Sequence, residues 1–403
     1  MNAYLRPVTN PEVSAPESAE DIRVRMQRVA AVAASHADAV DREGRAPVEA
    51  IAAVKAENLM GVLVPREFGG EGATHRDVIE ACFILGQACA SSGLIYAMHQ
   101  VKVACLVRHG LASAWHQGFL ARLCAEQLLL ASSTTEGQSG GNVRSSDAPV
   151  IQEDGRIRLS RDASVISYGE VADALVTTAR RAPDAAASDQ VLLVLDNGDY
   201  TLTRTGGWDT LGMRGTVSAG FQLEAEADPD QILPDSYERI HRESMVPSAH
   251  LFWSSVWAGI AADAVERARR HVAKSARSME GRTPPSMPHL IRAMTALRAL
   301  RALIAANGAR FEAIKEDRAA LGALEFQNAI TLFKVEASEL AVEAVTCALR
   351  ATGLSGYRND GDTSLGRRLR DVLSAPIMIS NDRILSNLGT ACLVVGTPQS
   401  IHD

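Results

Sequence analysis

The chain has 403 residues, of which 46% are hydrophobic, and a formal net charge of −7 at pH 7. This length and apolar content predict a globular protein with more than one hydrophobic core. The acidic balance, without any block of like charges, excludes the charge pattern of a nucleic-acid-binding protein and would repel an anionic membrane surface.

The N-terminal stretch MNAYLRPVTNPEVSAPESAED carries charges and prolines where a signal peptide would have an apolar run. No later stretch reaches ~18 uninterrupted apolar residues, the length that a transmembrane helix needs. We therefore expect a cytoplasmic protein without a membrane partner. The six cysteines are scattered and form no CxxC pair, which favours reduced thiols and no metal site.

The first third of the sequence has the periodicity of helices. Ser18, followed by Asp21, predicts a helix start, and apolar residues then recur on one face. Further helices are expected at residues 47–61, 76–89, 92–109 and 112–129. Residues 1–129 are therefore expected to form a helical N-terminal domain.

Residues 131–143, ASSTTEGQSGGNV, are rich in short hydroxylated side chains and glycine. Such residues allow backbone N–H groups and hydroxyls to approach a flat or phosphorylated ligand. The stretches RIRLS, SVISY, ALVTTAR, QVLLVLD, YTLTR and FQLEAEA follow, separated by turn clusters. They predict a central β domain at residues 130–238.

Long helical patterns return at residues 256–279, 288–315, 324–352 and from 366 onward. Their heptad-like apolar spacing is typical of a packed bundle. The expected fold class is α+β multidomain, with a helical bundle at residues 239–403.

Six separated motifs, in chain order, resemble those of the acyl-CoA dehydrogenase family. They are PREFGG (65–70), Thr-Glu followed by Gly-Gly-Asn (135–142), VISYGEVADALV (165–176), GWDTLGMRGTVSAGF (207–221), RSMEG (277–281) and GLSGY with RLRD (353–371). The resemblance implies an α-helical domain, a β domain and a C-terminal four-helix bundle, assembled as a homotetramer or homodimer around FAD.

The resemblance also implies a flavin site. Thr134 and Thr135 would bond the flavin ring, and Ser167 would approach it from the neighbouring strand. The remaining implied cofactor-binding residues are Gly140, Gly141, Val165, Arg277, Arg350 and Asn381. Val165 replaces the family's tryptophan and Arg350 its glutamine, whereas Arg277 would reach the flavin of an adjacent subunit.

The position of the catalytic base departs from the family pattern. Members use a glutamate to remove the α-proton of an acyl thioester, but an ungapped count places Ile379 there. The family's alternative base position holds Phe252, followed by Trp253 instead of arginine. Neither Ile379 nor Phe252 can accept a proton. The remaining candidates for a base are Asp382, His250 and His99.

Two reactions therefore remain open. The first is α,β-dehydrogenation of an acyl thioester, with an electron-transfer flavoprotein as partner; it needs a proton acceptor and a polarised carbonyl. The second is that of the family's flavin monooxygenase branch, in which reduced flavin, FAD or FMN, comes from a flavin reductase and its hydroperoxide oxidises a small-molecule substrate. Phe252, Trp253 and Ile379 would suit the second by excluding water from the substrate pocket. An inactive paralogue is the third alternative.

Overall fold

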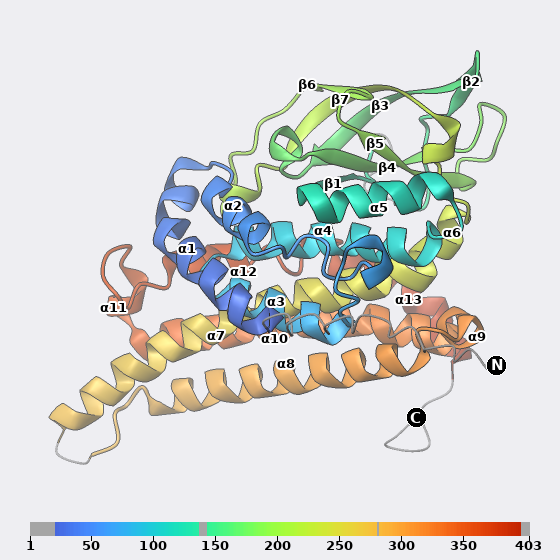
Figure 1. Cartoon of the computed structure of the whole chain (residues 1–403). Helices are drawn as coiled ribbons and strands as arrows, with labels where there is room; N and C mark the ends of the chain where they lie inside the picture. Colours follow the sequence, from blue (N-terminus) through green and yellow to red (C-terminus); the bar gives the residue numbers. More distant parts are fainter. Residues whose placement is uncertain (1–20, 137–142, 280–281, 396–403) are drawn as a thin grey trace, which may run out of the picture.

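The computed structural model of the chain describes residues 21–136, 143–279 and 282–395. N-terminal helices lie between the β-sheets on one side and long C-terminal helices on the other (Figure 1). The predicted α+β fold class, with helical, β and helical regions in chain order, is confirmed. None of the helices in these ranges is long and apolar enough to span a membrane.

The N-terminal part of the fold is helical, as predicted. Its helices are α1 Ile22–Glu43, α2 Val48–Ala56, α3 His75–Ala88, α4 Ala90–His109 and α5 Ala114–Glu126, with a short 3-10 turn, η1, at Arg66–Phe68. Asp21 caps α1 by accepting a hydrogen bond from Arg23 N, whereas Ser18 lies outside the described residues. The second helix ends at Ala56 and not near residue 61, because Asn58 has a left-handed φ of 54°.

The described strands form two sheets, with strand orders β1-β4-β5 and β2-β3-β7-β6. The strands are β1 Leu130–Ser133, β2 Ile151–Glu153, β3 Arg156–Ile166, β4 Ala174–Arg180, β5 Gln190–Asp196, β6 Tyr200–Arg204 and β7 Ala219–Ala227. The stretches RIRLS and SVISY, expected as separate strands, largely fall within β3, which pairs irregularly with β7 between Ala163 and Ile166. β1 pairs in parallel with β4. The sequence pattern predicts β4 but predicts no strand at the position of β1.

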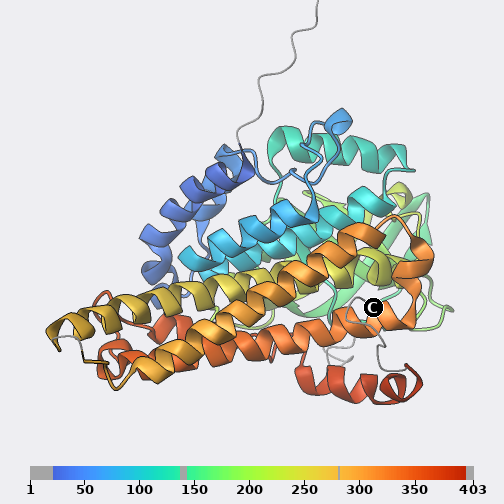
Figure 2. The same cartoon turned by 90° about the horizontal axis from the view of Figure 1, so that it is seen from below.

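The C-terminal part is a helical bundle in which α7, α8 and α10 pack against one another and the shorter α13 packs on α10, seen from below in Figure 2. The elements are α6 Tyr237–Ile240, the π-helical turn η5 His241–Met245, α7 Val246–Ser278, α8 Met287–Ile314, α9 Arg318–Gly322, α10 Leu324–Thr352, α11 Leu354–Tyr357, α12 Gly366–Val372 and α13 Asn381–Val394. α7 begins at Val246, earlier than residue 256, because Pro247 occupies the first turn, where a proline is tolerated.

The helices α3 and α7 cross with their backbones in direct contact. A Cβ atom added to Gly259 would lie 2.4 Å from Phe83 O and 2.8 Å from Gln87 N, and one added to Gly86 would lie 2.6 Å from Val256 O. Only glycine fits at such a distance. This crossing fixes the N-terminal helices against the bundle.

We expect Gly259→Ala to lower the free energy of unfolding by about 2 kcal/mol, because its methyl group would force the two backbones apart. Gly118 is the control, since it lies on the exposed face of α5 and an added Cβ meets no atom within 4 Å. Gly118→Ala is expected to raise stability by up to about 1 kcal/mol. Denaturant titrations measure the unfolding free energy of both variants. Equal changes in the two variants would contradict a direct backbone contact between α3 and α7.

His99 ties α4 to β1. Its Nε2 lies 2.9 Å from Met60 O, and its Nδ1 lies 3.0 Å from Leu130 N. A carbonyl only accepts and a backbone N–H only donates, so His99 is neutral with its proton on Nε2. Burial lowers the pKa of His99 to about 4, against the smaller opposing effect of its bond to Met60.

This histidine makes stability depend on pH. The folded pKa of about 4 lies below the ordinary value of 6.5, so the unfolded chain takes up the extra proton on acidification. The contribution of His99 is complete above pH 6.5 and is lost as the pH falls toward 4. We expect the unfolding free energy of His99→Gln to fall less steeply with decreasing pH, by up to about 1.4 kcal/mol per pH unit. Urea titrations at several pH values measure the unfolding free energy of both proteins. Parallel curves of this free energy against pH for His99→Gln and the unmodified protein would contradict the role of His99.

Candidate functional site

The expected flavin contacts on the β domain come together where the two sheets meet. Thr134 and Thr135 follow β1 and are half-buried, and the next residue, Glu136, forms an antiparallel bridge with Ala163 of β3. Two residues beyond Ala163, Val165 has 38% of its surface exposed. Gly140 and Gly141 lie outside the described residues. The junction thus presents an apolar side chain beside short hydroxylated ones.

A buried ion pair holds the start of the glycine-rich loop. The Glu136 carboxylate lies 3.2 Å from Arg161 Nη1 and accepts hydrogen bonds from Ser146 Oγ and Asp147 N. Arg161 is 1% exposed, and burial lowers the pKa of its guanidinium. This pair was not predicted; its signal in the sequence is an arginine on the inward face of a strand whose other inward residues are apolar.

A chain of hydroxyls leads to Ser167. Thr216 Oγ1 donates to Met213 O at 2.9 Å, Ser218 Oγ lies 2.8 Å from Thr216 Oγ1, and Ser167 Oγ lies 2.7 Å from Ser218 Oγ. The Met213 carbonyl can only accept a hydrogen bond, so the Thr216 hydroxyl donates its proton to it and must accept a hydrogen bond from Ser218. Ser218 in turn accepts a hydrogen bond from Ser167. Ser167 therefore offers only lone pairs to a ligand.

Two β-branched residues among those considered have left-handed backbones. Val217 lies within the hydroxyl chain with φ of 43°, and Ile379, at the expected base position, has φ of 48°. This conformation is strained for β-branched side chains, and such strain clusters at functional sites. Ile379 is also 41% exposed.

Lys334 of α10 holds the turn that carries Ile379. Its buried ammonium donates to Ile379 O at 2.9 Å and to Asn381 Oδ1 at 2.8 Å. The amide nitrogen of Asn381 donates to Ser338 Oγ and Glu339 Oε1. The side chain of Asn381 is thus engaged inside the protein, where it fixes this turn, and its expected contact with a cofactor stays a prediction.

The proposed bases lie in different environments. His250 is 3% exposed and donates from Nδ1 to Ile330 O at 2.8 Å, which leaves Nε2 with the lone pair. Burial lowers the pKa of His250 to about 4, so it is a weak base. Asp382 is exposed in the first turn of α13. His99 has a backbone partner on each ring nitrogen and has none free for a substrate.

Phe252 and Trp253 point to different places. Phe252 is fully buried and stacks on His75 of α3, with ring centroids 5.4 Å apart. Trp253 is partly buried, lies 6.3 Å from the His250 ring, and leaves its buried Nε1 without a partner among the described residues. Consecutive helical residues diverge by about 100°, so the two side chains leave α7 in different directions. Trp253 is the one beside a candidate site residue.

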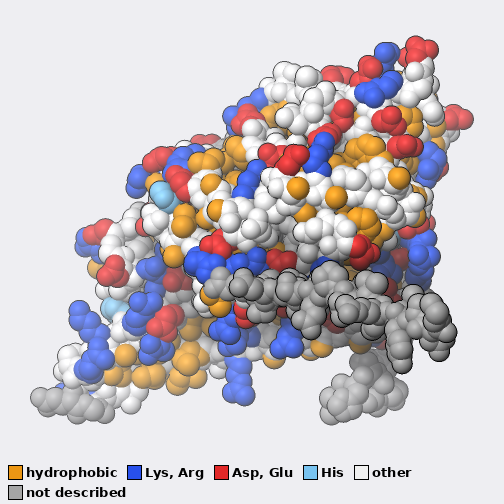
Figure 3. Space-filling view, in the orientation of Figure 1, with side chains coloured by type: hydrophobic (Ala, Val, Ile, Leu, Met, Phe, Trp, Pro, Cys, Tyr) orange, Lys and Arg blue, Asp and Glu red, His pale blue; other side chains and the backbone are white. Residues whose placement is uncertain are grey.

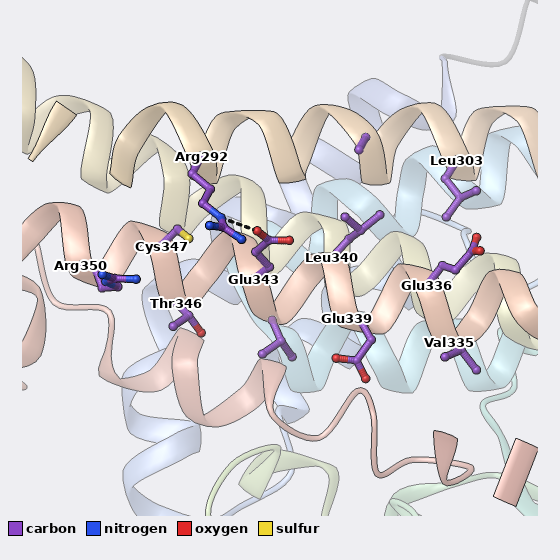
Figure 4. Close-up of a pocket in the computed structure, with 12 residues that line it drawn as sticks. Arg292, Leu303, Val335, Glu336, Glu339, Leu340, Glu343, Thr346, Cys347 and Arg350 are labelled. Atoms are coloured by element: carbon purple, nitrogen blue, oxygen red, sulfur yellow. Dashed lines mark hydrogen bonds and ion pairs between the residues drawn. The ribbon is translucent and has the colours of Figure 1, made fainter. Parts of the chain in front are cut away.

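Arg277 and Arg350 lie away from the sheet junction. Arg277 is exposed in the last turn of α7, at the far end of the bundle in Figure 1. Arg350 lines an open groove of about 800 Å³ between α8 and α10 (Figure 4), across which Arg292 Nε lies 2.7 Å from Glu343 Oε1. No residue of the β domain lines this groove. Within one chain, neither arginine is brought to Thr135.

A hydrogen-bonded series, Asp235–His109–Ser244, fixes η5 against α4. His109 Nδ1 lies 2.7 Å from Asp235 Oδ2, and Nε2 lies 2.8 Å from Ser244 Oγ. The spacing matches a hydrolase triad, but Ser244 is 3% exposed and sits in a helical turn. The series therefore serves as a junction between elements. Burial lowers the pKa of His109, against the opposing effect of Asp235.

The visible surface has mixed charge. Basic and acidic side chains are interspersed over the face in Figure 3, and apolar side chains reach the surface along its lower edge, over α8. Ile291 and Met294 of this helix are 56% and 47% exposed. The five cysteines whose side chains are described are buried and unpaired, and the described residues contain no His, Cys, Asp and Glu group fit for a metal ion.

Models of the acyl-CoA dehydrogenase N-terminal and C-terminal domains match residues 16–127 and 253–380. A probable acyl-CoA dehydrogenase, YngJ of Bacillus subtilis, is 25% identical over 47% of this chain and 50% of its own length. The oxygenase component of an FADH(2)-dependent resorcinol hydroxylase from Rhizobium sp. is 28% identical over 50% of this chain and 45% of its length. The chain thus spans about half the length of these relatives.

The FMN-bound structure of TdsC, a dibenzothiophene monooxygenase from Paenibacillus sp. A11-2, superposes with a TM-score of 0.80. It covers 95% of this chain and 100% of TdsC at 18% identity, which establishes the shared fold. The two family-model matches bracket the β domain and agree with the helical regions on both sides of it. The chain belongs to the acyl-CoA dehydrogenase family.

Proposed function

We propose that this chain is the oxygenase component of a two-component flavin-dependent monooxygenase, which receives reduced flavin from a partner reductase. The observation that carries the proposal is the expected base position. Ile379 stands there, the amide of Asn381 is engaged, and His250 has a pKa of about 4. Removal of an α-proton needs a positioned base of suitable pKa, which these residues do not supply.

Two relatives support this direction. One is named as the oxygenase component of a resorcinol hydroxylase, and TdsC is a dibenzothiophene monooxygenase with FMN bound. At sequence identities as low as these, proteins of one fold can catalyse different reactions. The residues of the site must therefore decide which reaction this chain catalyses. The substrate of this chain is a separate question from theirs.

The residues at the sheet junction fit a flavin. Thr134 and Thr135 would bond the ring, Val165 would pack on it, and Ser167 would accept a hydrogen bond from it. Arg277, exposed at the far end of α7, would contact the flavin phosphate of a neighbouring chain, and Arg350 would belong to the same shared site. The site is then complete only in a homo-oligomer, a dimer or a tetramer.

The hydroxyl chain would favour the reduced form of a flavin whose N5 lay beside Ser167. Nitrogen N5 carries a hydrogen in the reduced ring and a bare lone pair in the oxidised ring. Ser167 offers only lone pairs, because its proton is directed to Ser218. The site would therefore bind the N5–H donor of a reduced flavin better than the N5 acceptor of an oxidised flavin. A protein that takes up reduced flavin from a reductase requires this preference.

A reduced flavin supplies two electrons to O2, so that one oxygen atom enters the substrate and the other leaves as water. The residues of the chain would exclude water and hold the parts of the site in a fixed geometry. Lys334 fixes the turn of Ile379, whose apolar side chain and that of Trp253 would keep water from the reacting oxygen. FMN is the expected flavin, with FAD as the family's alternative.

Acyl-thioester dehydrogenation is the second candidate. The family and the name of YngJ favour it. It would require His250 Nε2 or the exposed Asp382 as base. Asp382→Asn tests whether Asp382 is the base. Unchanged enzymatic turnover in this variant would exclude Asp382 as the base, whereas loss of turnover in a folded variant would support dehydrogenation.

The preference for reduced flavin is testable with Ser218→Ala, which frees the Ser167 proton to serve oxidised N5. We expect the ratio of Kd for oxidised FMN to Kd for reduced FMN to fall about fivefold, the value of one hydrogen bond near 1 kcal/mol. Fluorescence titration and anaerobic titration give the two constants. Ser160→Ala, which removes an exposed β3 hydroxyl bonded to Glu224, is the control and should leave the ratio unchanged. A ratio unaltered by Ser218→Ala would reject the directional hydroxyl chain.

The reaction type is tested on FMN-loaded protein without knowledge of the substrate. Anaerobic addition of butyryl-CoA should leave the oxidised flavin spectrum unchanged. After chemical reduction and admission of air, hydrogen peroxide should appear more slowly than from free reduced FMN, because the site excludes water. Bleaching by butyryl-CoA, or peroxide release as fast as from free FMN, would overturn the monooxygenase proposal.

A further inference from the structure

Asp371, near the end of α12, is a buried acid that bonds the loop between β6 and β7. The residue is 4% exposed, and its Oδ1 accepts a hydrogen bond from Met213 N at 2.7 Å. The backbones of α12 and this loop also touch, since a Cβ atom added to Gly212 would lie 2.1 Å from Arg370 O. Arg370 Nη1 donates to Leu211 O at 2.9 Å. α12 and the loop therefore form one closely packed junction.

Met213 is held in an unfavourable backbone conformation by contacts on both of its peptide groups. Its φ of 53° is left-handed, which costs free energy for a residue other than glycine. Its N–H bonds Asp371, and its carbonyl accepts from Thr216 Oγ1 at 2.9 Å, from Thr216 N at 3.1 Å and from Trp208 Nε1 at 3.1 Å. Without the bond to Asp371, Met213 would relax toward a preferred φ and its carbonyl would turn with it.

The Met213 carbonyl is the group that gives the hydroxyl chain its direction. Because this carbonyl can only accept, it takes the Thr216 proton, and Ser218 and Ser167 then donate in turn toward it. A displaced carbonyl would leave the Thr216 proton free to turn toward Ser218, which reverses the chain. Hydrogen bonds on the two sides of Met213 thus connect the buried acid with the hydroxyl expected beside the flavin.

We propose that Asp371 is a positioning residue of the flavin site: by bonding the Met213 N–H, it holds the carbonyl that directs the hydroxyl chain and thereby sets which redox state of the flavin Ser167 prefers. This role rests on the proposed function, since it reaches the flavin through that chain. It needs a hydrogen-bond acceptor at position 371 and not a charge. Asparagine, whose Oδ1 also accepts, should therefore replace Asp371, whereas alanine should not.

A second acid that ties α12 to its surroundings provides a matched control. Asp263 of α7 accepts hydrogen bonds from Arg368 of α12 at 2.6 Å and from Arg267 at 2.9 Å. Neither partner belongs to the loop of Met213. Asp263→Ala should therefore weaken the attachment of α12 to the bundle without acting on the hydroxyl chain.

The test is the ratio of Kd for oxidised FMN to Kd for reduced FMN, measured at about pH 8. Burial raises the pKa of Asp371 to about 6, against the opposing effect of its bond to Met213, so the carboxylate is ionised in this measurement. We expect the ratio to fall about fivefold in Asp371→Ala and to stay within about twofold in Asp371→Asn and Asp263→Ala. Asp371→Ala combined with Ser218→Ala should lower it no further than either change alone, because both break the same chain.

An unchanged ratio in Asp371→Ala, an equal fall in Asp371→Asn, or additive falls in the double variant would overturn the proposal. If Asp371→Ala does not fold, Asp371→Leu takes its place, because leucine has a similar branched shape without an acceptor.

Hydrogen exchange of the Thr216 amide, which bonds Met213 O, gives a measurement on flavin-free protein. Relative to the strand amides of β4 and β5, this exchange should become about tenfold faster in Asp371→Ala but not in Asp371→Asn. Equal exchange in the two variants would reject the role of Asp371. Failure of the unmodified chain to bind FMN would instead reject the proposed function and leave the ordering of the chain by Asp371 in place.

Discussion

The backbone contact between α3 and α7 is the constraint on which the rest of the structure depends. Gly86 and Gly259 allow the two helices to touch, which sets the N-terminal layer against the bundle. α4 is thereby held between α7 and β1, with His99 bonded to Leu130 and His109 bonded to Ser244. The sheet junction, η5 and the turn of Ile379 take their relative positions from this arrangement.

The arrangement that results buries histidine and lysine side chains in and around the candidate site. Its histidines are neutral because burial disfavours their charged forms. Its lysines are buried, Lys334 as a clamp on Ile379 and Lys102 beside Met245. Strained backbones at Val217 and Ile379 show that the fold holds these turns against local preference. These features support the proposal that Ile379 stands where the family carries its catalytic glutamate.

Much of the fold followed from periodicity, since long amphipathic helices and β-branched strands carry strong local signals. β1 was missed because it has only four residues, and its partner, β4, is distant in sequence. Thr134, Thr135, Val165 and Ser167 were predicted from motifs and lie around one junction. The expected roles of Asn381 and His99 stay predictions, because motif position reveals which residue is present but not which neighbours already bond it. The ion pair of Arg161 and the bond of Asp371 to Met213 depend on tertiary contacts that no local pattern reports.

We propose that the site is built for a reduced flavin. The most direct measurement is the midpoint potential of FMN bound to the unmodified protein, compared with that of free FMN. Because preferential binding of the reduced form shifts the equilibrium toward reduction, the account predicts a more positive potential for the bound flavin. A potential more negative than that of free FMN, which reports tighter binding of the oxidised form, would contradict it.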